Sequence, residues 1–299
     1  MAYHVPALLD ESIKGLNIRP DGVYVDATFG SGGHSREILK HLTTGRLIAF
    51  DIDEDASANI IEDERFTFLN QNYRFLLNNL RYLGITEVDG IIADLGVSFH
   101  QFDEPSRGFA FRYDAELDMR MSRGMKTKAS DLLATMTEEE LAHIFTEYGE
   151  LPLARKIARA IAVAREKAPL KTAEDLKKVT AHFVPPGHQN RFFAKLFQAL
   201  RIAVNNELES LKEFLLQSAE ILKKGGRLVV ITYHSLEDRL VKNFMKSGNF
   251  TGEVSRDFYG RPELIFRLVT KKAVTPGRAE TETNKRARSA KLRVAEKIK

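Results

Sequence analysis

The first third of the chain alternates short apolar runs with stretches of helical character, and this alternation restricts the fold more than any other feature. Six segments carry it, at residues 23–28, 36–41, 47–51, 66–69, 73–82 and 90–94. A strand–helix rhythm of this kind builds βαβ units, whose strands lie parallel in one sheet with helices on its faces. The sequence therefore predicts an α/β fold around an open parallel sheet.

The pattern changes in the middle of the chain, where residues 107–205 read as almost wholly helical. Thr137 and Glu140 form a capping box, and Ala154, Ile157 and Ile161 recur at helical spacing as one apolar face. Sheet-type segments then resume, with a helix at 208–222 that stops at Lys223–Gly226, a strand at 227–232, a helix at 236–245 and a last strand at 263–270. We predict a core formed by residues 1–106 and 206–299, with residues 107–205 inserted as a helical subdomain for substrate recognition.

Composition excludes several classes of protein. The chain has no cysteine, which rules out disulfides and thiolate metal sites, and no His/Glu pair has the spacing of metal ligands, so we expect no metal. The N-terminal residues lack a basic leader with an apolar run, and no apolar run approaches the roughly 20 residues that span a bilayer. We therefore expect a cytoplasmic protein without a membrane partner.

Positive charge is concentrated at the C-terminal end. Lys271–Lys299 holds ten Lys/Arg and three Asp/Glu, a net charge of +7 within a chain whose total is +4. Such a segment is either a solvated tail or a site for a polyanion, and composition leaves both open.

A glycine-rich turn follows the first predicted strand. The strand ends at Asp26, and Gly30, Gly32 and Gly33 precede a helix. Glycines at such a turn let backbone N–H groups approach a ligand, and the helix N-terminus adds partial positive charge. A simple tight turn without a ligand is the structural alternative.

Two acidic residues at the ends of predicted strands extend this argument. Asp51 follows the second strand, where a carboxylate accepts hydrogen bonds from ribose hydroxyls, and Asp94 ends the strand at 90–94. Both NAD and S-adenosylmethionine fit so far. The turn lacks the third spaced glycine of the dinucleotide fingerprint, and Asp26 suits a cationic sulfonium or amino group better than a pyrophosphate. Asp94 should lie beside the cofactor. The alternative is that its side chain only caps the loop that follows the strand.

Further motifs resemble one family over nearly the whole chain, the cytosine-N4 methyltransferases of small-subunit ribosomal RNA, of the MraW or RsmH type. The matching blocks are His4–Glu11, Asp26–Ser35, Asp89–Gln101, Arg107–Phe111, Leu117–Met121, Tyr148–Glu150, Phe197–Ile202 with Val204–Asn205, His234–Arg239 and Arg286–Arg293. The sequence departs from the usual pattern at Phe99, Ser106, Asp114–Glu116 and Tyr233, where the family commonly has Ser, Glu, Gly-Pro and Phe. None of these departures removes a charged residue or a glycine that the family motifs require.

The resemblance implies a class I, Rossmann-like methyltransferase sheet with a helical insert, S-adenosylmethionine as the cofactor, and a cytosine in the decoding (P-site) region of 16S ribosomal RNA as the acceptor. It also implies which residues contact the cofactor. They are Gly32, Gly33, His34, Asp51, Tyr73, Asp94 and Gln101.

The chemistry requires a group that holds cytosine N4 in line with the methyl donor, because the N4 lone pair is delocalised into the ring. The polar-Pro-Pro-aromatic motif of many amino-methyltransferases is absent, since the chain reads Asp94-Leu-Gly-Val. We predict Asp94 and His234 as catalytic residues, with a purely structural hydrogen bond as the alternative for His234.

RNA binding is assigned to arginines and lysines of the insert and of the tail. The predicted contacts are Arg107, Arg112, Arg201, Arg286, Arg288, Lys291 and Arg293. The expected partner is 16S ribosomal RNA or the small ribosomal subunit, and a homodimer is left open. The strand–glycine–acid arrangement also permits a nicotinamide-dependent oxidoreductase, and the basic segments permit a non-catalytic RNA-binding protein.

Overall fold

The computed structural model describes residues 6–299, so His4 and Val5 of the first family block lie outside the described residues. The chain forms two compact units. One combines Met1–Gly96 with Leu208–Lys299 and is called the sheet unit below, and the other, Val97–Glu207, is called the helical unit. The predicted insert spans residues 107–205. Its predicted start therefore lies ten residues after the observed start of the helical unit, and its predicted end lies two residues before the observed end.

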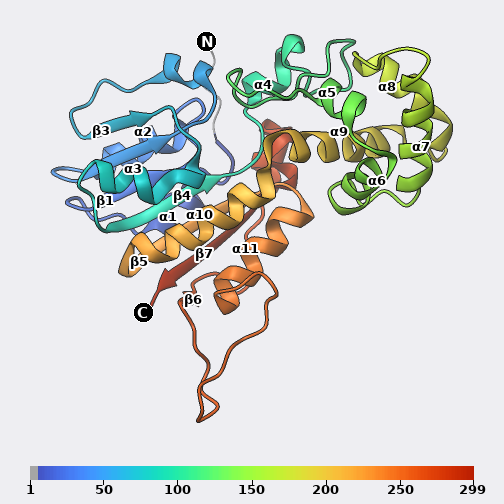
Figure 1. Cartoon of the computed structure of the whole chain (residues 1–299). Helices are drawn as coiled ribbons and strands as arrows, with labels where there is room; N and C mark the ends of the chain where they lie inside the picture. Colours follow the sequence, from blue (N-terminus) through green and yellow to red (C-terminus); the bar gives the residue numbers. More distant parts are fainter. Residues whose placement is uncertain (1–5) are drawn as a thin grey trace. The chain divides into compact units, whose positions relative to one another are not determined.

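The sheet unit contains one seven-stranded sheet in the order β3-β2-β1-β4-β5-β7-β6 (Figure 1). Its first five strands are parallel, and β7 runs antiparallel to both of its neighbours. This arrangement confirms the predicted class I, Rossmann-like sheet. The strands are β1 (Val23–Asp26), β2 (Arg46–Phe50), β3 (Phe66–Leu69), β4 (Val88–Asp94), β5 (Leu222–Thr232), β6 (Phe266–Leu268) and β7 (Lys291–Lys297).

Buried side chains alternate between the two faces of this sheet, as the two-residue period of a strand requires. Val25 and Ile91 join one core with Phe214 and Phe244, whereas Tyr24 and Ile92 join the core on the other face. Helices cover both faces because each face is apolar. They are α1 (Leu9–Leu16), α2 (Gly33–His41), α3 (Leu76–Tyr82), α10 (Glu207–Ile221), α11 (Ser235–Ser247) and α12 (Arg278–Thr283).

Two features of the C-terminal third differ from the sequence prediction. The helix α10 ends at Ile221 and passes directly into β5, so Lys223–Gly226 is not a helix stop but the irregular start of a strand, with Gly225 at a φ of 83°. The basic tail, which composition left open between a solvated end and a polyanion site, contributes a strand to the sheet that the sequence did not predict. Its residues Lys291–Lys297 form β7, and Leu292 and Val294 are buried against the sheet.

The helical unit has its own apolar core. Its elements are α4 (Phe99–Asp103), α5 (Ala129–Thr135), α6 (Glu138–Glu147), α7 (Ala154–Arg165), α8 (Ala173–Thr180) and α9 (Gln189–Asn205), with short 3-10 turns at Pro105–Arg107 and Ala181–Phe183. The predicted capping box of Thr137 and Glu140 is present, and Ala154, Ile157 and Ile161 are buried in the core.

One stretch of the helical unit departs from the predicted helix. Residues 108–128 are irregular, because polar side chains satisfy their backbone groups in place of a helix. Asn205 accepts from the N–H of Met121 over 2.7 Å and donates to the carbonyl of Met119 over 2.7 Å. Over residues 6–299, no helix combines the length and the apolar character needed to cross a membrane.

Candidate active site

The carboxyl ends of β1, β2 and β4 form the centre of the candidate site. The order of the sheet reverses between β1 and β4, which is the point at which open α/β sheets bind ligands. Asp26 ends β1, Asp51 follows β2 and Asp94 ends β4. The fold therefore brings together three of the acids that the sequence singled out.

The turn between β1 and α2 requires its glycines. Gly32 is the residue before α2 and has a φ of 78°, and a Cβ there would lie 2.9 Å from the ring of Phe29. Gly33 begins the helix, and a Cβ there would lie 2.8 Å from Pro6. The backbone can consequently pass close to a ligand at the N-terminus of α2, as predicted for a cofactor turn.

Asp51 is half-buried and keeps free acceptor capacity. One of its carboxylate oxygens accepts from the N–H of Gly30 over 2.6 Å and the other from the N–H of Asp53 over 2.9 Å. A carboxylate offers about four acceptor positions, so two remain for a pair of neighbouring hydroxyls. These free acceptor positions fit the hydroxyl groups of the ribose of an adenosine-type cofactor.

Burial of these acids has an electrostatic consequence. Desolvation raises the pKa of Asp94 to about 7, and it raises the pKa of Asp26 and of Asp51 to about 6. Asp26 adds negative charge near both of the other two carboxyls. Within residues 6–299, no lysine or arginine forms an ion pair with any of the three. A cationic ligand would offset this buried negative charge, and the sulfonium and ammonium groups of S-adenosylmethionine are such cations.

His34 lies beside this group of acids without acting as a cation. Burial lowers its pKa to about 4, and a hydrogen bond to the backbone of Ala7 opposes that shift only in part. Its Nδ1 lies 4.0 Å from Oδ2 of Asp94, and its buried Nε2 has no hydrogen-bond partner. A neutral imidazole with a free nitrogen suits a cofactor contact, the role that the resemblance implies.

Asp94 is held from two sides. Its backbone N–H donates to the hydroxyl of Thr28 over 2.6 Å, and the phenol of Tyr233 donates to Oδ1 over 2.8 Å. The ring of Tyr233 also lies 3.5 Å from the position of a Cβ on Gly96. In the sequence, Tyr233 stands out only as a departure from the family pattern. That departure is the one sign in the sequence that Tyr233 could bind Asp94.

His234 has a structural role in this fold. It is the residue before α11, its Nδ1 accepts from the N–H of Glu237, and its Nε2 lies 3.0 Å from Oε1 of the same glutamate. These contacts fit the alternative of a structural hydrogen bond, whereas the buried Nε2 has no hydrogen-bond partner among the described residues, so the catalytic role of His234 stays a prediction. Glu237 is buried, accepts from the N–H of Tyr233 over 2.9 Å and contributes to the raised pKa of Asp94, and sequence reasoning did not select it.

The remaining predicted cofactor contacts fall in both units. Tyr73 begins a short 3-10 turn in the sheet unit, and its ring packs edge-on against Phe214 with centroids 5.2 Å apart. Gln101 belongs to the helical unit, where it completes the capping box of α4 with Ser98.

The predicted RNA contacts divide into buried and accessible residues. Arg107 is 3% exposed and donates to the carbonyl of Met121 over 2.9 Å, and Arg201 forms a two-point ion pair with Glu207. In β7, Arg293 forms a similar pair with Asp238. The guanidinium groups of these three arginines already bind groups of the protein, which disfavours them as RNA contacts, and their assignment to RNA stays a prediction.

The other predicted contacts are more accessible. Arg112 and Arg288 are exposed, Arg286 and Lys291 are half-buried, and Lys291 lies 3.4 Å from Asp238. Arg112 pairs with Asp103 and lies over the ring of Tyr113. Phe111, in the same stretch, packs against Phe193 and Phe197.

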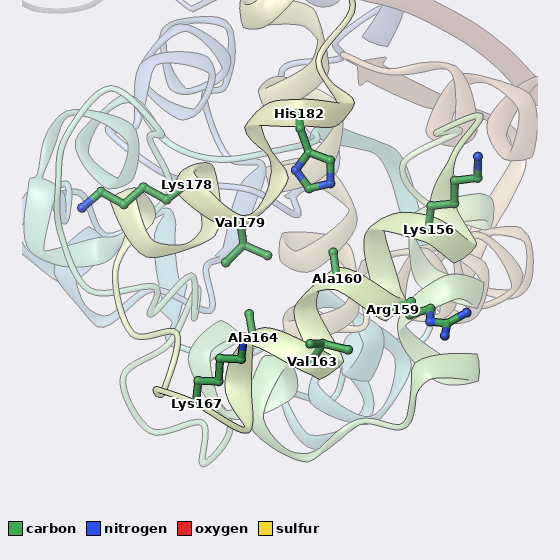
Figure 2. Close-up of a pocket in the computed structure, with 9 residues that line it drawn as sticks. All are labelled: Lys156, Arg159, Ala160, Val163, Ala164, Lys167, Lys178, Val179 and His182. Atoms are coloured by element: carbon green, nitrogen blue, oxygen red, sulfur yellow. The ribbon is translucent and has the colours of Figure 1, made fainter.

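A basic hollow lies between α7 and α8 of the helical unit (Figure 2). Its volume is about 610 Å³. Cationic side chains surround it and small apolar side chains form its floor, among them the half-exposed Val163. Its lining residues are Lys156, Arg159, Ala160, Val163, Ala164, Lys167, Lys178, Val179 and His182. Among residues 6–299, no carboxylate forms an ion pair with any of its lysines or its arginine.

Comparison with known proteins decides between the functional alternatives. The model of the MraW methylase family matches residues 1–298. The chain belongs to the MraW methylase family. It is a methyltransferase with S-adenosylmethionine as its methyl donor, and membership in this family replaces the oxidoreductase and non-catalytic alternatives.

Curated relatives of this MraW methylase match at full length. The chain is 54% identical over 299 residues to the Ribosomal RNA small subunit methyltransferase H of Flavobacterium johnsoniae, covering 100% of this chain and 99% of the relative. It is 54% identical over 298 residues to the protein of the same name from Bacteroides thetaiotaomicron, covering 99% and 98%. A solved rRNA methylase from Streptococcus thermophilus is 11% identical, with a TM-score of 0.43 and coverage of 100% and 99%.

Proposed function

We propose that this MraW methylase transfers a methyl group from S-adenosylmethionine to the exocyclic N4 of a cytosine in the decoding region of 16S ribosomal RNA. The observation that carries the proposal is the full-length match, at 54% identity, to relatives named for small-subunit ribosomal RNA methylation. The half-buried carboxylate of Asp94, at the switch point of the sheet, supports an amino group as the methyl acceptor.

The residues at the sheet edge have distinct roles in this proposal. Bound S-adenosylmethionine would supply a methyl group activated by its sulfonium. Asp51 holds the ribose, Gly32 and Gly33 let the backbone approach the cofactor, and His34 contacts it as a neutral ring. These groups position the donor, and precise positioning is a large part of catalysis when the leaving group is already activated.

Asp94 acts on the acceptor. Its carboxylate accepts a hydrogen bond from the amino group of cytosine, which orients the N4 lone pair and favours its pyramidal form. As the bond from N4 to the methyl carbon forms, the bond from that carbon to the sulfonium sulfur breaks and its electron pair stays on sulfur. The nitrogen must then lose one proton, and the ionised Asp94 is the group placed to accept it. A carboxyl with a pKa near 7 is suited to this exchange at neutral pH, because both of its protonation states are accessible.

The helical unit is assigned to substrate recognition. The basic hollow between α7 and α8 supports this assignment, because its unpaired cations can neutralise RNA phosphates. Arg112 and the tail residues Arg286, Arg288 and Lys291 are the other proposed contacts that are more accessible.

The test is methyl transfer to defined RNA substrates. Purified protein, labelled S-adenosylmethionine and either extracted 16S ribosomal RNA or small subunits that lack the modification would be incubated together. Mapping of the labelled nucleotide should place the methyl group on N4 of one cytosine in the decoding region. Label on another atom, or on another RNA, would reject the proposed acceptor.

A further inference from the structure

Two adjacent aromatic rings are largely exposed to solvent at the end of a loop in the sheet unit. The loop connects α11 to β6, and Figure 1 shows it running out from the sheet and returning as a narrow hairpin. At its tip Phe258 is 96% exposed and Tyr259 is 79% exposed. Aromatic side chains contribute much of their stabilisation by burial, so two neighbouring rings left in water indicate a partner.

The tip is held in shape by its own hydrogen bonds. Oδ1 of Asp257 accepts from the N–H groups of Tyr259 over 2.9 Å and of Arg261 over 2.8 Å. The N–H of Asp257 donates to the carbonyl of Arg261 over 2.9 Å, and the guanidinium of Arg256 donates to the carbonyl of Gly260 over 2.7 Å. Because the turn is closed by these bonds, the rings are presented at little further cost in conformational entropy.

Planar groups are gathered at this tip. The rings of Phe258 and Tyr259 lie edge to face, with centroids 5.5 Å apart and an interplanar angle of 87°. The guanidinium of Arg261 lies 5.9 Å from the centroid of the Tyr259 ring. In the described chain, neither Arg256 nor Arg261 forms an ion pair with a carboxylate, so their positive charge is available to a ligand.

The size and chemistry of the tip favour one class of partner. A specific protein interface buries at least about 1,200 Å² in total, which two rings on a narrow turn do not supply. Insertion into a membrane is disfavoured by the charged Arg256, Asp257 and Arg261 that surround the rings. An unpaired nucleobase is flat, stacks on aromatic rings and guanidinium planes, and carries a phosphate that the arginines can neutralise.

We propose that the hairpin tip at residues 256–261, called the aromatic tip, is a stacking platform for an unpaired base of the RNA substrate. The inference rests on the proposed function, since it takes the substrate to be RNA. It adds a recognition element that lies outside the helical unit and away from the acids that hold the cofactor.

The test is the affinity of the full-length protein for extracted 16S ribosomal RNA, measured by filter binding over a range of salt concentrations. Replacing both Phe258 and Tyr259 by Ala should weaken binding by about 5- to 150-fold for each stacked base that is lost. The slope of affinity against salt should stay the same, because no cation is removed. Tyr82→Ala is the matched control, since Tyr82 is 90% exposed on α3, and it should bind like the wild type.

Two further variants distinguish stacking from apolar contact. Replacing both rings by Trp should restore affinity, whereas replacing both by Leu, which is apolar but has no flat face, should not. Full binding by the Leu variant would overturn the stacking assignment. A defect seen with assembled small subunits but not with extracted RNA would also overturn it, because the partner would then be a ribosomal protein.

The same experiments distinguish an error in the proposed function from an error in the stacking role of the aromatic tip. If the wild-type protein neither binds nor methylates ribosomal RNA, the proposed function is wrong. If the wild type does both and the Ala variant matches it in affinity, only the aromatic tip is refuted.

Discussion

The phenol of Tyr233 donates a 2.8 Å hydrogen bond to Oδ1 of Asp94, and this bond joins the ends of β4 and β5. The bond stabilises the ionised form of the aspartate, so it lowers a pKa that burial raises. Burial and the adjoining Asp94 also raise the pKa of Tyr233 itself above its usual range, which keeps the phenol protonated as a donor. A Phe at this position could not make this bond, because it has no hydroxyl group.

Tyr233→Phe should therefore shift the pH dependence of methyl transfer. Without the phenol, the pKa of Asp94 rises above about 7, and the acidic limb of the rate profile moves to higher pH. A hydrogen bond to a charged group contributes about 1.5 to 3 kcal/mol, so the rate at pH 6 should fall roughly tenfold or more. The loss at pH 9 should be at most about threefold, because a large part of Asp94 is ionised there even after this rise in its pKa. Single-turnover assays at saturating cofactor measure both rates, and an equal loss at both pH values would contradict the explanation.

Asp94→Asn keeps the shape of the side chain but removes its charge and its ability to take a proton. Turnover at saturating cofactor should fall by more than the affinity for RNA does, because the carboxylate acts mainly on the reacting amino group. Single-turnover methyl transfer and RNA binding on the same preparation provide the comparison. Near wild-type turnover would exclude Asp94 from the chemistry.

Asp51→Ala removes the proposed acceptor of the ribose hydroxyls. The affinity for S-adenosylmethionine should fall by about 1.5 to 3 kcal/mol, the range for hydrogen bonds to a charged group. The N–H groups of Gly30 and Asp53 lose their shared acceptor as well, so thermal melting must first show that the variant is folded. Calorimetric titration measures the affinity, and a folded variant with unchanged affinity would mean that the ribose binds elsewhere.

The parts of the fold that sequence reasoning identified are those fixed by local pattern. The strand Phe66–Leu69 is where the pattern placed it, and the glycine turn, Asp51 and Asp94 lie at the predicted edge because parallel strands bring their carboxyl ends together. The helical period likewise identified the buried face of α7.

Interactions between residues that are far apart in sequence were not predictable. Composition left the basic tail open between a solvated segment and a polyanion site, and it gave no sign that Leu292 and Val294 are buried because β7 completes the sheet beside β5. Arg293 reads as an RNA contact, yet its partner Asp238 lies 55 residues earlier in α11. Composition and spacing contain no signal for such a pair, since both residues are common on protein surfaces.

Arg293→Ala should destabilise the sheet unit and leave the salt dependence of RNA binding unchanged. The substitution leaves Asp238 without its two-point partner in a largely buried position, which should cost about 1 to 3 kcal/mol. The control is Arg267→Ala. Glu296 keeps its other partner Arg227 in that variant, and loss of an exposed pair costs at most about 1 kcal/mol.

The stability difference should itself depend on pH. Arg293 and Lys291 hold the pKa of Asp238 below its usual range in the folded protein. Their stabilising effect is therefore complete above the ordinary carboxyl pKa of about 4, and it disappears as the pH falls through the lowered value. Thermal melting should show the full deficit of Arg293→Ala at pH 7 and a smaller one below pH 4. A deficit that persists unchanged at low pH would mean that packing of the arginine, and not its charge, supports β7.

The basic hollow leads to a prediction for the salt dependence of RNA binding. Lys156 and Arg159 lie on the same helix, α7, and each supplies a charge that no carboxylate in the described chain neutralises by an ion pair. Each phosphate contact contributes roughly 0.7 to 0.9 to the slope of log affinity against log salt concentration, so replacing both residues by Ala should flatten the slope by about one to two units. The matched control is Lys177→Ala, because Lys177 on α8 already pairs with Glu174 over 2.9 Å and should contribute less to the slope. Affinity for S-adenosylmethionine should stay the same in both variants. If the double variant keeps the wild-type slope while replacement of Arg286 and Arg288 flattens it, the tail and not the helical unit holds the phosphates.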